Sequence, residues 1–486
     1  MLVRTVLYIL IFLIELMVFT KFRSSKVRQI CLLAGSCVLY LSWGAWFGAV
    51  LLTSIVMNYL LGEWIRRQPL APALSTGILL NLGLLSAFKY LPAFAITEPF
   101  SSLQKLAHLA LPLGISFWTF QAMSYLFDLY RGEEIDPSFV EFALYMAFFP
   151  VTISGPICRM PEMLPQFRSQ SSLVRSDIEI GLRRIATGVL MMQLARLLGQ
   201  GILAGDGISS GFDRVTHWSG TDVWCLAFGY GLQLFFDFAG YSHIAIGAAK
   251  VFGFTLPENF ARPFQSSNPS VFWTRWHMSL SFWIRDYVFF PLATMRREIW
   301  WRNLVLVFSM LVFGVWHNAT WLFVIWGCYH GVLLVVHRLL QQLHRKPDGE
   351  PPAALWKPLS WTLTIALISL GWIFFRASSL AEAVQMLSAV ITPASYLSHS
   401  VSGSLYFMVA VLGLGYLLVL LTVDALGRYA TSSEALKPHA GSRVIAFLAR
   451  KRWLWVPPLY ALTLLLVLAV TWTQAPATSQ FMYRAF

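Results

Sequence analysis

Two histidines lie in strongly apolar stretches of this sequence, at positions 277 and 317. His317 stands in GVWHNATW, inside the apolar stretch 305–336, and His277 stands in FWTRWHMSLSFW. An imidazole titrates near neutral pH and can accept a proton, and an ionisable group in hydrocarbon costs free energy unless it is paired or faces a polar cavity. The pattern therefore predicts a polar site, with His317 as a candidate functional residue. The alternative interpretation is a packing histidine bonded to a nearby carbonyl group.

The segment around His277 holds several groups able to bind or polarise a substrate. Arg275 and Trp276 come directly before it, and Arg285 and Asp286 follow in SFWIRDYV. One short basic connection joins this segment to the one that carries His317. Two histidine segments linked in this way indicate a polar site built inside a membrane protein.

Composition decides the class of protein. Hydrophobic residues make up 57% of the 486 residues, charged residues make up 12%, and the mean hydropathy is +0.62. A water-soluble domain of this size could not cover so much apolar surface with polar side chains. We expect an all-α polytopic membrane protein, a bundle with short and re-entrant helices around a central cavity, formed by residues 1–486 as one domain.

The charged residues and the cysteines exclude other classes. The net charge is +13, but Lys and Arg cluster in short connections between apolar segments, as topology signals do. We therefore expect membrane lipid, and no nucleic acid, as a partner. The five cysteines have no metal-site spacing, so we expect small core residues and no metal. They are Cys31, Cys37, Cys158, Cys225 and Cys328.

Apolar segments recur along the whole chain. The first carries Glu15 and is followed by the basic run KFRSSKVR, which predicts an uncleaved membrane helix and no signal peptide. Several segments are shorter than the roughly 20 residues that span a bilayer, which favours half-spanning helices covered by protein. The predicted segments are 5–20, 30–40, 46–61, 74–88, 106–127, 139–153, 185–203, 223–238, 241–254, 304–316, 321–336, 361–375, 406–423 and 455–472.

Basic connections orient the chain across the membrane. The positive-inside rule places them in the cytoplasm, at 21–28, 159–184, 296–302, 338–346 and 437–452. The third and fourth of these connections bracket His317. On a helix that starts near Leu304, His317 would lie about 20 Å along the axis, inside the hydrocarbon core and nearer its outer face. His330 lies on the returning helix at shallower depth, and we interpret it as a packing histidine.

Known soluble-enzyme motifs are missing from the sequence. It has no Gly-rich phosphate loop, no HExxH and no GxSxG. Asp237, Tyr241, Ser242 and His243 lie beside a Phe-Ala-Gly stretch that we interpret as a flexible turn. These polar groups either line a pore or make packing hydrogen bonds.

Taken together, these motifs resemble the membrane-bound O-acyltransferase family. The signature region, about 233–337, contains FFDFAGYSHIAIGAAKVFGFTLPENFARPF, FWTRWHMSLSFWIRDYVFFPL and GVWHNATWLFVIWGCYHG. Residues 111–133, 148–160 and 371–387 resemble the bacterial alginate O-acetylase subgroup. The motif RWHMSLSFWIRDYV is equally similar to the teichoic-acid D-alanyl transfer proteins, so this motif does not assign the acceptor.

The resemblance implies roles for individual residues. His317 corresponds to the essential histidine of the family, and His277 to a second histidine or polar position. Acyl transfer from a thioester to a hydroxyl needs a base and donors for the developing oxyanion. A neutral imidazole at His317 would be the base, and direct transfer and an acyl-histidine both stay open. Six further residues are expected to bind substrate, position it or stabilise charge: Arg275, Trp276, Arg285, Asp286, Trp316 and Asn318.

Two departures from the subgroup concern the acceptor and the cytoplasmic loop. Asn318 stands where the subgroup usually has Gly, and PLATM, residues 291–295, stands where Pro-Leu-Gly-Gly is common. The reaction type is unaffected by either change.

The sequence therefore predicts a multi-pass O-acetyltransferase of the bacterial inner membrane, acting on an alginate- or cellulose-like exported polysaccharide. The family resemblance implies no tightly bound cofactor, acetyl-CoA or another acyl thioester as donor, and a periplasmic acetyl-handling partner protein. Acylation of peptidoglycan or teichoic acid is the alternative within the class. A membrane transporter is the alternative from another class, which internal repeats would favour.

Overall fold

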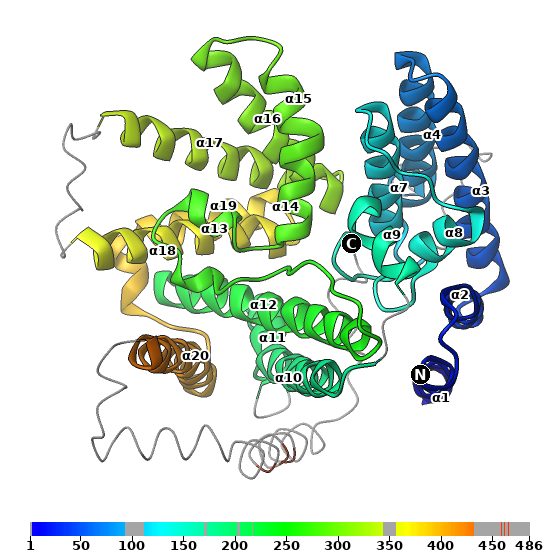
Figure 1. Ribbon diagram of the computed structural model, residues 1–486. Helices are drawn as coiled ribbons and strands as arrows, with labels where there is room; N and C mark the ends of the chain where they lie inside the picture. Colours follow the sequence, from blue (N-terminus) through cyan, green and yellow to red (C-terminus); the bar gives the residue numbers. More distant parts are fainter. Residues whose placement is uncertain are drawn as a thin grey trace. The chain divides into compact units, whose positions relative to one another are not determined.

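A computed structural model describes residues 2–92, 111–169, 173–201, 205–215, 217–343 and 356–431, together with 458, 461 and 465. Regular structure within these ranges is helical, and the β-type pairing found there is one isolated bridge between Phe260 and Trp276. Seven of the described helices are long and apolar enough to cross a membrane. The all-α polytopic class is thereby confirmed (Figure 1).

The described residues group into two compact units. Unit 1 contains residues 1–185, 241–261 and 276–319, and unit 2 contains 186–240, 262–275 and 320–486. Two long helices, α10 (Arg175–Gln200) and α12 (Gly220–Val251), have residues in both units. The single domain expected from the sequence stays a prediction.

Unit 1 contains the N-terminal helices and both predicted catalytic histidines. Its long helices are α1 (Leu2–Lys21), α2 (Ser25–Leu41), α3 (Ala45–Arg67), α4 (Ala71–Lys89), α7 (Ile115–Tyr130) and α16 (Ile299–His317). Its short elements are α8 (Phe139–Ala147), α9 (Met160–Arg168), α14 (Met278–Ile284), the π-helical turn η2 (Arg285–Phe289) and α15 (Phe290–Ala293).

Unit 2 contains three short elements that precede the histidines in the chain and the helices that follow His317. They are α11 (Ile208–Arg214), η1 (Pro263–Gln265), α13 (Pro269–Trp273), α17 (Trp321–Leu343), α18 (Trp356–Arg376), α19 (Leu380–Ile391), η3 (Pro393–Leu397) and α20 (Gly403–Thr431).

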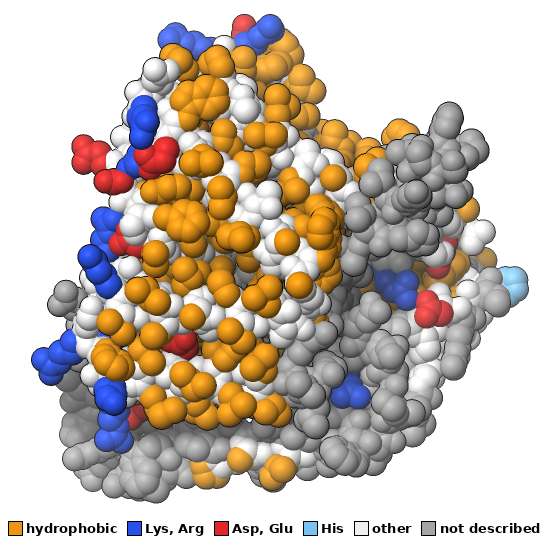
Figure 2. Space-filling view, turned by 90° about the vertical axis from the view of Figure 1, so that its right-hand side faces the viewer, with side chains coloured by type: hydrophobic (Ala, Val, Ile, Leu, Met, Phe, Trp, Pro, Cys, Tyr) orange, Lys and Arg blue, Asp and Glu red, His pale blue; other side chains and the backbone are white. Residues whose placement is uncertain are grey.

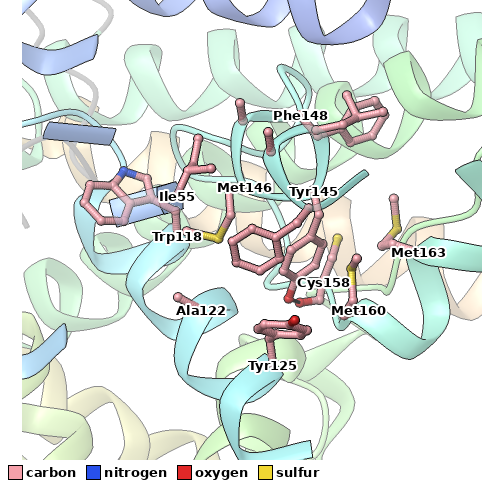
Figure 3. Close-up of a cluster of buried hydrophobic side chains, with 14 of the residues drawn as sticks. Ile55, Trp118, Ala122, Tyr125, Tyr145, Met146, Phe148, Cys158, Met160 and Met163 are labelled. Atoms are coloured by element: carbon pink, nitrogen blue, oxygen red, sulfur yellow. Dashed lines mark hydrogen bonds between the residues drawn. The ribbon is translucent and has the colours of Figure 1, made fainter. Parts of the chain in front are cut away.

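Helix α7 is the buried centre of unit 1. Nearly every side chain from Ile115 to Leu129 is buried, as expected for a helix that is enclosed on all sides. Figure 3 shows Tyr125 of α7 beside Tyr145 of α8, with Met146 between Tyr145 and Trp118. The Tyr145 hydroxyl donates to the carbonyl oxygens of Gln121, at 3.1 Å, and Cys158, at 2.9 Å. These bonds satisfy a buried hydroxyl and tie α7 and α8 to the turn that precedes α9.

One broad face of the molecule is apolar. Figure 2 shows hydrophobic side chains over most of the described part of this face, with most Lys and Arg toward its left and upper edges. Leu60 on α3 and Leu79 on α4 are 60% and 70% exposed, and both helices are candidate spans. Large exposed apolar side chains on membrane-length helices are what a lipid-facing surface requires.

The structure corrects several predicted boundaries. The Phe-Ala-Gly stretch is not a turn, because α12 runs unbroken from Gly220 to Val251 and joins the predicted segments 223–238 and 241–254. Gly240 instead permits close helix packing, since a Cβ there would lie 2.8 Å from the Gly188 carbonyl oxygen of α10. Helix α8 ends at Ala147, six residues before the predicted end at position 153. The predicted segment 455–472 and the basic connection 437–452 lie outside the described residues, apart from single positions.

Candidate active site

His277 occupies a strained position at the start of α14. It precedes the helix in the left-handed region, with φ 43° and ψ 53°, and its side chain is fully buried. A non-glycine residue rarely adopts this conformation, and surrounding contacts must maintain it. The backbone N–H of the next residue, Met278, donates to the Asn259 carbonyl oxygen at 2.9 Å. The bridge between Phe260 and Trp276 holds the chain on the other side of His277.

Asn259 anchors this turn through its side chain as well. It is fully buried, and its Oδ1 accepts a hydrogen bond from Ser279 Oγ at 2.6 Å. Its Nδ2 donates to Ser242 Oγ at 3.1 Å. Sequence reasoning assigned no role to Asn259, and the only signal was its place in the quoted stretch TLPENF, directly before the aromatic Phe260.

His317 is the last residue of α16. The helix begins at Ile299, five residues before the predicted Leu304, so His317 lies about 27 Å along the axis and not about 20 Å. The predicted depth is corrected accordingly, toward the far end of the span. The imidazole is 4% exposed and stacks on Phe313, one turn earlier, with ring centroids 5.5 Å apart. Asn318 follows as the C-cap, and its N–H donates to the Gly314 carbonyl oxygen.

The two histidines share the same aromatic neighbours. The Trp316 ring lies 4.7 Å from His317 and 6.1 Å from His277, measured between centroids. Phe313 lies 5.5 Å from His317 and 6.3 Å from His277. Lys89 reaches the same cluster, with Nζ 4.9 Å from the centre of the Trp316 ring. The structure therefore brings His277, His317 and Trp316 together and places beside them Lys89, to which the sequence analysis gave no role.

Stacked aromatic rings continue from Trp316 to α14. Phe120 of α7 lies parallel to Trp316 at 5.6 Å and parallel to Trp283 at 4.2 Å. The Trp283 indole N–H donates to the Phe120 carbonyl oxygen at 3.0 Å. This stack fixes the distance between the helix that His277 starts and the helix that His317 ends.

Arg285 and Asp286 form a separate group. They lie about 12 Å beyond His277 along the helical run formed by α14 and η2. Asp286 accepts from Arg285 at 2.7 Å and from Arg159 at 2.6 Å. Burial alone would raise the pKa of the Asp286 carboxyl, but these two guanidinium groups outweigh it and hold that pKa below its usual range. Arg285, Asp286 and Arg159 therefore form an ion-pair network that is separate from the His277 imidazole.

A buried acid lies next to this network. Tyr287 donates its hydroxyl hydrogen to Asp128 at 2.7 Å. Burial raises the pKa of Asp128 to about 6, although the bond from Tyr287 opposes the shift. Arg131 and Arg159 each lie 5.1 Å from the Tyr287 ring centre, so cation–π contacts complete the cluster.

The other predicted residues each make packing or backbone contacts. Trp276 is buried and contacts the Phe260 ring at 5.2 Å. Arg275, the last residue of a unit 2 segment, is half-buried in the turn after α13, where its N–H donates to the Phe272 carbonyl oxygen. His330 is buried between the rings of Trp273 and Trp326, at 5.1 and 4.9 Å, which agrees with the packing interpretation.

Two residues with an open interpretation take part in packing networks. Ser242 bonds to Asn259, as described above. His243 accepts from Arg184, and the same guanidinium forms two bonds of 2.6 Å with Glu258. Among the residues that the structure describes, no group of three or more His, Cys, Asp or Glu side chains could hold a metal ion.

Comparison with known proteins identifies the family. Residues 71–379, more than half of the chain and a range that includes both histidines, match the model of the membrane-bound O-acyltransferase family. The chain belongs to this family. It is accordingly an acyltransferase of a multi-pass membrane type, and a transporter is not supported.

Individual relatives are similar over most of the acyltransferase. A peptidoglycan O-acetyltransferase of Helicobacter pylori is 34% identical over 400 residues, covering 75% of this chain and 73% of the relative. A probable alginate O-acetylase of Azotobacter vinelandii is 33% identical over 390 residues, covering 76% and 73%. A teichoic acid D-alanyltransferase of Streptococcus thermophilus is 32% identical over 273 residues, covering 52% and 64%.

Proposed function

We propose that this acyltransferase moves an acetyl group from a cytoplasmic thioester toward hydroxyls of an exported cell-surface polysaccharide. The main support for the proposal is that His277 and His317 both contact the rings of Phe313 and Trp316. Support for acetyl as the acyl group comes from similarity that extends over about three quarters of the chain in two O-acetylating relatives, against 52% in the D-alanyl relative.

The chemistry assigned to His317 is general base catalysis. Its neutral imidazole accepts the proton as the acceptor hydroxyl attacks the thioester carbonyl carbon and the new C–O bond forms. The tetrahedral intermediate then expels the sulfur, the C–S bond breaks, and the proton passes from the imidazolium to the leaving thiolate. A base near the reacting hydroxyl contributes about 10²- to 10⁴-fold to such a reaction.

The other residues would support this step. His277 lies close enough to share Trp316 with His317, so we assign it to orientation of the substrate or of the base. Trp276, Trp316 and Asn318 are assigned to the substrate path near the histidines. Arg275 is assigned to charge stabilisation. Arg285 and Asp286 are assigned to the donor side, where positive charge attracts the phosphates of acetyl-CoA.

Location and partners complete the proposal. The seven candidate spans fit a multi-pass protein, and we assign it to the bacterial inner membrane with its basic connections in the cytoplasm. A periplasmic protein that carries or passes on the acetyl group would be its partner. An alginate- or cellulose-like exopolysaccharide is the acceptor we propose first.

Peptidoglycan is the second candidate acceptor. The peptidoglycan O-acetyltransferase is as similar to this chain as the alginate O-acetylase is, at 34% and 33% identity. Both candidates involve the same bond, an acetyl ester of a sugar hydroxyl, so the distinction lies in the acceptor alone.

The test is chemical analysis of a deletion strain. Base-labile acetate should fall in one surface fraction, either the exopolysaccharide or the peptidoglycan, and return with the wild-type gene but not with His317→Ala. Purified protein in sealed vesicles, with its partner and acceptor, should convert a labelled acetyl thioester into a labelled ester. Unchanged acetate in both fractions, together with intact movement of substrate in vesicles, would contradict the proposal.

A further inference from the structure

The end of helix α4 lies against the end of helix α16. Lys89, the last residue of α4, donates through Nζ to the Trp316 carbonyl oxygen. Tyr90, the next residue, donates its hydroxyl hydrogen to the Val315 carbonyl oxygen at 3.0 Å. These two carbonyls belong to the final turn of the helix that carries His317.

Both bonds satisfy backbone carbonyl groups at the C-terminus of α16. The last four carbonyls of an α-helix have no partner within the helix, and an unsatisfied one that is buried costs free energy. The Asn318 N–H donates to the Gly314 carbonyl oxygen. Tyr90 donates to the carbonyl oxygen of Val315, and Lys89 to that of Trp316. A cation at a helix C-terminus is also favourable, because partial negative charge gathers there.

Lys89 makes two further contacts that fix its ammonium group. Nζ lies 3.4 Å from the Ser116 hydroxyl at the start of α7. It also lies 4.9 Å from the centre of the Trp316 ring, within cation–π range. An ammonium group has three donors, so a single lysine can join α4, α7 and α16 at one point.

We propose that Lys89 and Tyr90 are positioning residues for His317: by holding the last turn of α16, they set the place of the Trp316 ring and of the imidazole next to it. This inference rests on the proposed function, in which His317 is the base. Trp316 transmits the effect, because its carbonyl and its ring contact Lys89 while its ring contacts both histidines. A displacement of about 1 Å at a reacting group can cost on the order of 100-fold in rate.

Matched variants test the proposal by kinetics. Lys89→Met keeps an unbranched side chain one atom shorter but loses the hydrogen-bond donors and the charge. Lys89→Arg keeps the donors and the charge. We expect Lys89→Met to lower kcat by roughly 10- to 100-fold with KM changed less than about threefold, and Lys89→Arg to recover most of the loss. Tyr90→Phe should lower kcat by a smaller factor, because it removes one of the two bonds. Lys26→Met, on an exposed lysine, is the control.

A second measurement needs no acyl transfer. A spin label on Ala319→Cys, two residues after His317, in a background without the native cysteines reports the mobility of the end of α16. Its spectrum should become more mobile in Lys89→Met and Tyr90→Phe and stay unchanged in Lys89→Arg. Wild-type kcat or an unchanged spectrum in Lys89→Met would overturn the inference, as would equal losses in Lys89→Met and Lys89→Arg. A wild-type protein that transfers no acetyl group, but whose label responds as expected, would contradict the proposed function alone.

Discussion

His277 starts one helix and His317 ends another, and both imidazoles pack against the indole of Trp316. The ring centroid of Trp316 lies 6.1 Å from that of His277 and 4.7 Å from that of His317. Neither residue lies in the middle of a regular helix. Their positions therefore depend on what fixes the two helix ends, which is Asn259 for His277 and the Lys89–Tyr90 pair for His317.

Removal of the proposed base should abolish transfer without loss of the protein. We expect His317→Ala to lower ester formation by at least about 100-fold, the lower bound for loss of a general base. Abundance in the membrane, measured by immunoblot, should stay near the wild-type level. Exposed His217→Ala is the matched control and should acetylate normally. Normal surface acetylation in His317→Ala would remove this residue from the mechanism.

The left-handed backbone conformation of His277 predicts that His277→Asn and His277→Val differ in stability. Asn tolerates the left-handed region, whereas a β-branched residue does so poorly, at a cost of about 1–3 kcal/mol. His277→Asn should therefore reach wild-type abundance and melting temperature, and His277→Val should fall below it. Both should lose most transfer activity if the imidazole orients the reaction. Equal thermal stability of the two variants in detergent would show that this backbone position carries no strain.

The Glu141–Arg168 pair predicts a pH-dependent contribution to stability. Arg168 donates two hydrogen bonds to Glu141, at 2.7 and 2.9 Å, and these bonds lower the pKa of the carboxyl to about 2. The native pKa lies below that of the unfolded chain, so the stabilisation is present above about pH 4.5 and is lost as pH falls toward 2. Arg168 is half exposed, so solvent screening limits the effect to about 1 kcal/mol.

Glu141→Gln should show this dependence directly. Its melting temperature in detergent should lie about 2 °C below the wild-type value at pH 7, and the difference should shrink at pH 3. Glu162→Gln, on an exposed carboxylate in α9, is the control and should match the wild type at both values. A difference that stays constant or grows toward acid would contradict the assignment.

Orientation of α16 can be tested by cysteine labelling. The positive-inside rule places the Arg296–Arg302 end in the cytoplasm, so a cysteine at exposed Met295 should react with an impermeant reagent only after permeabilisation. A cysteine at exposed Thr320, beyond the other end of the helix, should react in intact cells. Both variants need a background without the native cysteines. Reaction of Met295→Cys from outside would reverse the topology and move His317 to the cytoplasmic side.

The sequence alone determined the class of protein and most of its helices, and it singled out two histidines as candidates. Length and apolarity of a segment are local properties, and a bilayer allows few ways to satisfy the backbone of such a segment. Most membrane helices could therefore be predicted, with errors at their ends and one false break inside α12. His277 and His317 could be predicted because an ionisable side chain in an apolar stretch is conspicuous without any structure.

The tertiary structure decided which residues meet. Lys89 and Trp316 are 227 positions apart, and no spacing rule relates them. Asn259 gained its role from bonds to Ser242 and Ser279, and the Phe-Ala-Gly stretch became helix because Gly240 fits against α10. Such placements depend on packing between distant segments, which composition and periodicity do not encode.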